Sequence, residues 1–239
     1  IMTIWIRLIV AHIIADFFLQ TDAIASGKRS PSPSRLFYLF IHSVIHAALA
    51  YLFVAQWEIW QIPLIVFITH FMIDYTKTRF CQVSVVVFIV DQVFHLAILG
   101  ALWWWLFARA SELSTLLYIK EQLFRPKLWL ILTSYLLVLK PTSILLSLFI
   151  RQWTPKNNEQ QSLPSAGKWI GYLERVLTLT MMYLGCLEGI GFLLAAKSIF
   201  RFGELTKPRE VKITEYVMIG TLSSFAIAII IGALMHVIQ

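Results

Sequence analysis

Seven apolar runs recur along this chain of 239 residues, and each is close to the length of a helix that crosses a lipid bilayer. A helix rises about 1.5 Å per residue, so about 20 apolar residues cover the roughly 30 Å of hydrocarbon. The composition agrees, because 59% of the residues are hydrophobic and only 14% are charged. We therefore predict an all-α fold, a polytopic transmembrane helical bundle of about seven helices (six to eight). The runs lie near residues 2–20, 36–55, 60–76, 83–107, 128–150, 172–198 and 213–237.

Polar segments divide the chain into three predicted parts. Residues 1–110 hold four of the runs and are predicted to form a four-helix, metal-binding transmembrane half. Residues 111–170 comprise an interfacial amphipathic helix at 111–124, a fifth transmembrane or re-entrant run, and a hydrophilic linker. Residues 171–239 are predicted to form a C-terminal two-helix transmembrane part.

The chain is basic, with a net charge of +7 and an isoelectric point near 9.5. We nevertheless exclude nucleic acid as a partner, because no basic stretch is interleaved with exposed aromatic residues. In a membrane protein, Lys and Arg more often anchor loops at the headgroups. Cys81 and Cys186 form no CxxC pattern, so neither a disulfide framework nor a zinc knuckle is predicted.

Four consecutive runs each carry a pair of ionisable residues four positions apart. Residues i and i+4 lie on the same face of a helix, about 6 Å apart. Burying many ionisable groups in a membrane is costly unless they pair or coordinate an ion. We therefore predict one shared polar site and interpret it as a metal centre. The pairs are His12 and Asp16, His42 and His46, His70 and Asp74, and Asp91 and His95.

The order of residue types within these pairs predicts two layers. If consecutive helices run up and down, the first and third are parallel and read His then Asp, whereas the antiparallel fourth reads Asp then His. The reversal brings like residues to one level, so that His46 joins a histidine layer and His42 joins a carboxylate layer. Eight ligands exceed the needs of one tetrahedral ion and favour one or two divalent ions, with Zn preferred and Mn or Fe compatible.

The position of the pairs within the runs predicts that the site lies toward one membrane face. The loops at that face, residues 21–35 and 77–82, carry five Lys or Arg residues, whereas residues 56–60 at the other face carry none. By the positive-inside rule, the site faces the cytoplasm. The basic 201–212 loop conflicts with a strict count of seven helices. We therefore expect an error of one helix in the second half, or a re-entrant 128–150 run.

The segments AHIIADFFLQTD, HSVIH, THFMIDYTK and DQVFHL, in this order, resemble an uncharacterised family of bacterial inner-membrane proteins that is known only as a domain of unknown function. AAKSIFRF and EYVMIGTLSSF are similar to the C-terminal portion of its longer members. A weaker similarity, limited to intramembrane His/Asp motifs, links the chain to YdjM-like membrane-bound metal-dependent hydrolases, although their extended pattern is absent. These resemblances imply a multi-pass protein of the bacterial cytoplasmic membrane, and a hydrolase.

A metal-dependent hydrolase would use its ion to activate water and to polarise a carbonyl or phosphoryl oxygen. One of the three aspartates, Asp16, Asp74 or Asp91, would then act as general base rather than as a ligand. Gln20 and Gln92 flank the cluster and would either orient water and substrate or hold a metal ligand in place.

Two basic residues, Lys77 and Arg79, lie just beyond the site at the headgroup level. They are candidates to hold a phosphate, with snorkelling membrane anchors as the alternative. We therefore expect a substrate with an anionic head, such as a phospholipid or polyprenyl phosphate, and membrane lipids as partners. A homo-oligomer is left open.

The second half of the chain has polar residues of its own. Glu188 lies in mid-run among glycines, Lys197 lies nine residues on in a stretch of small residues, and Arg201 follows. We predict that Glu188 is buried with a Lys or Arg partner as a structural ion pair, with a substrate or ion pathway as the alternative. Lys140 and Pro141 interrupt the fifth run, and proline inside a helix usually kinks it.

Other functional classes are left open by the sequence. A divalent-metal or proton transporter needs polar residues that continue to the opposite face, whereas the fourth run continues as LAILGALWWWLF. A haem protein does not need an aspartate layer, and the dense HxxHH clusters of membrane di-iron desaturases are absent. A non-catalytic protein with a structural metal site would carry the same motif.

Overall fold

The computed structural model describes residues 2–108, 126–154, 166–202 and 208–238, and every regular element in these ranges is helical. The fold class is therefore all-α, as predicted. The chain divides into two compact units, Ile1–Thr133 and Ser134–Gln239, and the boundary falls inside helix α7 (Pro126–Val138). The predicted interfacial helix at 111–124 lies outside the described residues.

Several helices in the described residues have the character of membrane spans. On their outer faces, Leu52, Met72 and Val86 are all more than half exposed. An apolar exterior around polar buried residues is the arrangement expected of a membrane protein. Within the described ranges, four segments are long and apolar enough to cross a membrane: Ser34–Val54, Val85–Phe107, Lys127–Trp153 and Thr214–Met235.

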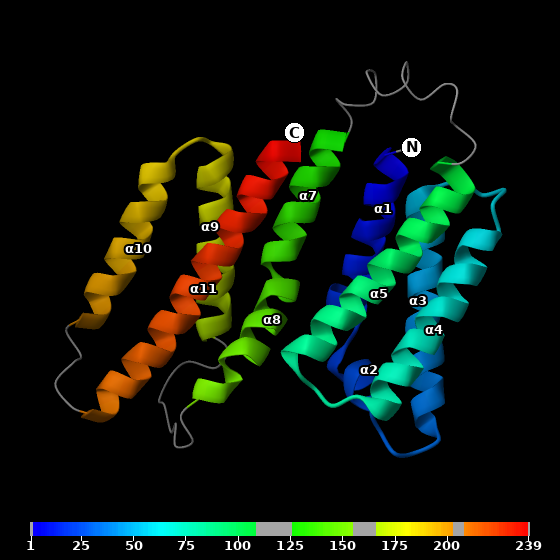
Figure 1. Ribbon diagram of the computed structural model, residues 1–239, viewed down its shortest axis with the longest axis horizontal. Helices are drawn as coiled ribbons and strands as arrows, with labels where there is room; N and C mark the ends of the chain where they lie inside the picture. Colours follow the sequence, from blue (N-terminus) through cyan, green and yellow to red (C-terminus); the bar gives the residue numbers. More distant parts are fainter. Residues whose placement is uncertain (1, 109–125, 155–165, 203–207, 239) are drawn as a thin grey trace. The chain divides into compact units, whose positions relative to one another are not determined.

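The first unit is a bundle in which α3 packs against α1 and α4, and α5 packs against the same two helices (Figure 1). Its elements are α1 (Met2–Ile13), the π-helix η1 (Ile14–Leu19), the short α2 (Asp22–Gly27), α3 (Ser34–Val54), α4 (Gln61–Phe80), α5 (Val85–Trp103) and the π-helix η2 (Trp104–Ala108).

Most helix ends in this unit lie within a few residues of the predicted ones. Helix α5 begins where Ser84 accepts a hydrogen bond from the backbone N–H of Val87 at 3.2 Å, a normal side-chain cap. Helix α3 ends at Ala55, whose φ of 54° is left-handed. Helix α4 runs four residues beyond the predicted end, so Lys77 and Arg79 belong to the helix rather than to a loop.

The apolar core of the bundle repeats the four-residue spacing of the polar pairs. Each of the four helices buries an apolar residue four positions from its histidine. This residue lies on the opposite side of the histidine from the other polar residue of the pair. Because i and i+4 share a helix face, each helix presents an apolar residue, a histidine and then a second polar residue in succession. The apolar residues are Leu8 on α1, Ala50 on α3, Val66 on α4 and Leu99 on α5.

The second unit begins with a broken helix. Helix α7 ends at Val138 and α8 (Lys140–Ile150) starts after Leu139, whose φ of −82° and ψ of −111° are not helical. Pro141 cannot donate a backbone hydrogen bond, which explains the break at this place. The carbonyl of Leu137, which loses its backbone donor at Pro141, accepts from the hydroxyl of Thr142 at 2.7 Å, and the carbonyl of Val138 accepts from Nε of the buried Arg175. The polar backbone of the break is thereby satisfied from inside the protein.

The rest of the second unit consists of η4 (Arg151–Trp153), α9 (Ala166–Tyr183), α10 (Leu187–Phe202) and α11 (Pro208–Ile238). The prediction of one crossing over 172–198 is wrong, because a turn separates α9 from α10. Gly185 at this turn has a φ of 71°, which favours glycine, and the N–H of Cys186 closes the turn on the carbonyl of Met181 at 2.8 Å. The described residues of this part therefore form three helices, where two were predicted.

The turn also gives Lys197 a different ion-pair partner from the expected Glu188. Glu188 lies in the first turn of α10 and is exposed, so it is not a buried acid in mid-helix. Lys197 instead donates to the carboxylate of Glu174 on α9, at 2.6 Å. The side chain of Arg201 lies outside the described residues.

Candidate metal centre

The structure brings all eight predicted site residues together inside the first unit. They come from four helical segments, α1 with η1, α3, α4 and α5, and each of the eight side chains is at most 9% exposed. Asp16 lies in the π-helical segment η1, and π-helical turns are often found at functional sites.

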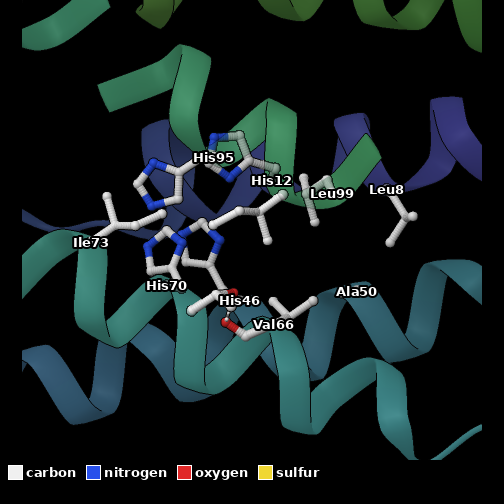
Figure 2. A pocket seen from close by; sticks show the side chains of 11 residues that line it. Leu8, His12, His46, Ala50, Val66, His70, Ile73, His95 and Leu99 are labelled. Carbon is white, nitrogen blue, oxygen red and sulfur yellow. Dashed lines mark hydrogen bonds between the residues drawn. The ribbon is translucent and has the colours of Figure 1, made fainter. Parts of the chain in front are cut away.

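Four histidines form one layer of the site. His12, His46, His70 and His95 line a cavity of about 20 Å³, and Figure 2 shows their rings grouped together with Leu8 and Leu99 to one side. The rings of His46 and His70 stack with centroids 3.5 Å apart, and those of His70 and His95 lie 4.2 Å apart. A cavity of this size has room for a water molecule or a single ion.

Three of these rings have a nitrogen without a hydrogen-bond partner among the described residues. They are the buried Nε2 atoms of His46, His70 and His95. Nearly all buried polar atoms in proteins are hydrogen-bonded, so three such atoms beside one cavity need an explanation. Neutral imidazole nitrogens are common metal ligands, and His70 is close enough to share a bound ion with His46 or with His95.

The fourth histidine of this layer is already engaged. His12 Nε2 lies 3.3 Å from the side-chain oxygen of Gln92. The amide nitrogen of Gln92 donates in turn to Asp16, at 3.0 Å. Gln92 therefore joins the two layers and fixes the orientation of one residue in each.

The three aspartates and His42 form the second layer. Asp16 accepts a hydrogen bond from His42 Nε2 at 3.0 Å and lies 3.4 Å from Nε2 of His46. Asp74 is fully buried and lies 3.6 Å from His42. Asp91 has one carboxylate oxygen, Oδ1, without a hydrogen-bond partner among the described residues.

Two lysines enter the carboxylate layer. Lys28, at the end of α2, is only 4% exposed and its ammonium group lies 2.5 Å from Asp74. Lys77 lies 2.9 Å from Asp74 and 2.7 Å from Asp91, so it bridges two carboxylates. Gln20 accepts a hydrogen bond from Lys28 at 2.7 Å and holds it in place.

These contacts correct the expectations for the basic residues near the site. Lys77 does not snorkel to the headgroup level, because its ammonium group points at the buried carboxylates. Arg79 is exposed near the end of α4. Lys28 was not predicted as a site residue, because it belongs to a loop with no helical periodicity. A buried carboxylate that lacks a cation is the one signal that could have pointed to it.

Two overlapping groups of these side chains could hold a metal ion. Within each group, one ligand atom per residue lies within 4.8 Å of the others, and His70 belongs to both groups. A mixed set of nitrogen and oxygen ligands suits Zn, Mn or Fe. The groups are Asp16, His42, His46 and His70, and His70, Asp74 and His95.

Comparison with known proteins adds a family but no activity. A family model described as a protein of unknown function (DUF3307) matches residues 4–124, about half of the chain. The chain belongs to this family. The matched segment contains all eight site residues and both lysines of the carboxylate layer. No curated protein matches the chain, and no solved structure matches it.

Proposed function

We propose that this protein is a membrane-embedded, metal-dependent hydrolase whose ion is held by the histidine layer. The observation that carries the proposal is a set of three buried Nε2 atoms, on His46, His70 and His95, that form no hydrogen bond among the described residues and belong to rings lining one cavity. An ion at this place would act as a Lewis acid and would make bound water a better nucleophile. The resident ion is proposed to be Zn, with Mn and Fe as alternatives.

The three aspartates of the carboxylate layer differ in how well they could act as the general base. Both oxygens of Asp16 accept hydrogen bonds, one from His42 and one from Gln92. Both oxygens of Asp74 lie beside ammonium groups. Asp91 keeps its Oδ1 free of hydrogen bonds among the described residues, so we assign it the role of accepting a proton from water.

The apolar layer on the far side of the histidines favours a hydrolase over a transporter. Leu8, Ala50, Val66 and Leu99 belong to the core cluster, and each lies one helical turn from a histidine of the layer. A path for ions or protons through the bundle would need polar groups at this level. The surroundings of the site are therefore mainly apolar on the histidine side and polar on the carboxylate side, as expected for a reaction centre that is reached from one membrane face.

The basic residues support a site near the cytoplasmic face of a bacterial inner membrane. With Lys28 and Lys77 inside the protein, the exposed Arg29 and Arg79 stay near the carboxylate end of the bundle, and Arg35 lies over the ring of Tyr75. This distribution fits the positive-inside rule. A substrate that combines an apolar tail with an anionic phosphate head suits such a place at the membrane surface.

The test is a hydrolysis assay on the full chain, purified in detergent with its metal. The panel would contain a long-chain alkyl phosphate, a phospholipid and a water-soluble phosphate monoester. We expect turnover of an amphiphile that is lost in Asp91→Asn, while the metal content is kept. Glu188→Gln, at an exposed position outside the site, is the control and keeps wild-type turnover. Stoichiometric metal without turnover of any amphiphile would instead mean a structural metal site.

A further inference from the structure

We propose that the centre binds one divalent ion and not two, because Lys28 and Lys77 occupy the place of a second cation. This inference rests on the proposed metal ion and adds its stoichiometry. It reverses the simplest expectation from eight ligands in two layers, in which carboxylates bridge a pair of ions.

The contacts of the two ammonium groups are those that a second ion would need. Each oxygen of Asp74 has its own ammonium neighbour, Lys28 at 2.5 Å and Lys77 at 2.9 Å. Lys77 also reaches Asp91 at 2.7 Å and so bridges two carboxylates, as a metal ion in a dinuclear site would do. A second ion could reach these oxygens only by displacing both lysines from buried positions.

The charge of the site leads to the same stoichiometry. The three aspartates carry three negative charges and the two lysines two positive charges, so with neutral histidines one negative charge is left. One divalent ion with one bound hydroxide makes the site neutral. While both lysines stay in place, two divalent ions with a shared hydroxide would leave two positive charges in a buried site, and an unbalanced buried charge is strongly disfavoured.

The positions of both lysine side chains are fixed by their surroundings. Lys28 is 4% exposed, and Gln20 accepts a second hydrogen bond from its ammonium group. The segment that carries it packs closely on α3, because a Cβ at Gly27 would lie 2.3 Å from the ring of Tyr38. Lys77 lies one helical turn after Asp74 on α4, which places its side chain beside the carboxylate.

The experiment is a Mn²⁺ titration of the full chain in detergent, followed by elemental analysis and electron paramagnetic resonance. We expect one equivalent in the wild type, with the spectrum of an isolated ion. The double variant Lys28→Met with Lys77→Met is expected to take up a second equivalent and to show an exchange-coupled pair. Lys77→Arg keeps the charge and is expected to stay at one equivalent, as is Lys197→Met in the second unit.

The outcomes separate this inference from the metal proposal itself. Two equivalents in the wild type would overturn the inference and leave the metal proposal intact. A double variant that binds a single equivalent would overturn the role given to the lysines. No bound Mn²⁺ in any form of the protein would overturn both. The wild-type measurement decides the stoichiometry even if the double variant does not fold.

Discussion

The Nδ1–H of His95 donates to the backbone carbonyl of Asp91, one turn earlier on the same helix, at 2.8 Å. A carbonyl oxygen can only accept, so this contact places the proton of a neutral His95 on Nδ1 and leaves a lone pair on Nε2. That Nε2 atom is one of the three near the cavity that form no hydrogen bond within the part of the chain that the structure describes. The tautomer that binds metal is therefore set by the helix itself, which is how many metal-binding histidines are oriented.

Removal of Lys28 is expected to destabilise the first unit. Lys28→Met would leave one oxygen of the buried Asp74 without its cation. Breaking a buried ion pair from one side costs about 3–5 kcal/mol. We expect a clearly lower thermal unfolding temperature in detergent. The neighbouring Arg29 is exposed, and Arg29→Met should stay within about 0.5 kcal/mol of the wild type. Equal losses in the two variants would contradict the buried position of Lys28.

The close packing of α2 on α3 leads to a second stability test. A methyl group added by Gly27→Ala would meet the ring of Tyr38 at 2.3 Å, and such overpacking costs about 1–3 kcal/mol. Gly167→Ala is the matched control, because nothing lies within 4 Å of its added Cβ. A Gly27→Ala protein as stable as the Gly167→Ala protein would argue against this contact.

Arg175 is expected to hold the broken helix of the second unit together. Its guanidinium group donates to the carbonyl of Val138, to Ser143 at 2.6 Å and to Ser224 at 3.0 Å. Arg175→Met would leave these acceptors unpaired, and each unsatisfied buried group costs about 1–3 kcal/mol. The exposed Lys168 serves as control through Lys168→Met, which should change little. The measurement is thermal unfolding, and an unaffected Arg175→Met protein would refute this role.

The turn at Gly185 can be tested through the partner of Lys197. A double-mutant cycle of Glu174→Gln and Lys197→Met should give a coupling of about 0.5–1 kcal/mol, because the pair is partly exposed. A cycle of Glu188→Gln with the same lysine should give none. No coupling between Glu174 and Lys197 would contradict the turn, because the two residues would lie about 35 Å apart on one continuous helix.

Much of the first unit could be predicted from spacing alone. Pairs such as His70 and Asp74 share a helix face whatever surrounds them, so four pairs in four consecutive helices must meet if the helices pack as a bundle. The result depends only on helix geometry, and single positions such as Leu8 and Leu99 then continue the same face into the apolar core.

The features that the sequence did not reveal depend on single residues outside any periodic pattern. Lys28 reaches the site from a loop, and its target Asp74 is 46 positions away in the chain. The turn at Gly185 lies inside a continuous apolar stretch, where one glycine in a left-handed conformation ends a helix. Neither hydropathy nor helical periodicity carries a signal for these contacts, because both arise from tertiary packing.

The central claim is that the histidine layer holds a metal ion, and elemental analysis of the purified full chain tests it most directly. We predict stoichiometric Zn, Mn or Fe in the wild type and in the control Lys197→Met. In His70→Ala the content should fall to background, because His70 belongs to both candidate ligand groups. A wild-type protein that is folded, resupplied with each metal and still free of it would contradict the claim. The cluster would then be a buried hydrogen-bond network.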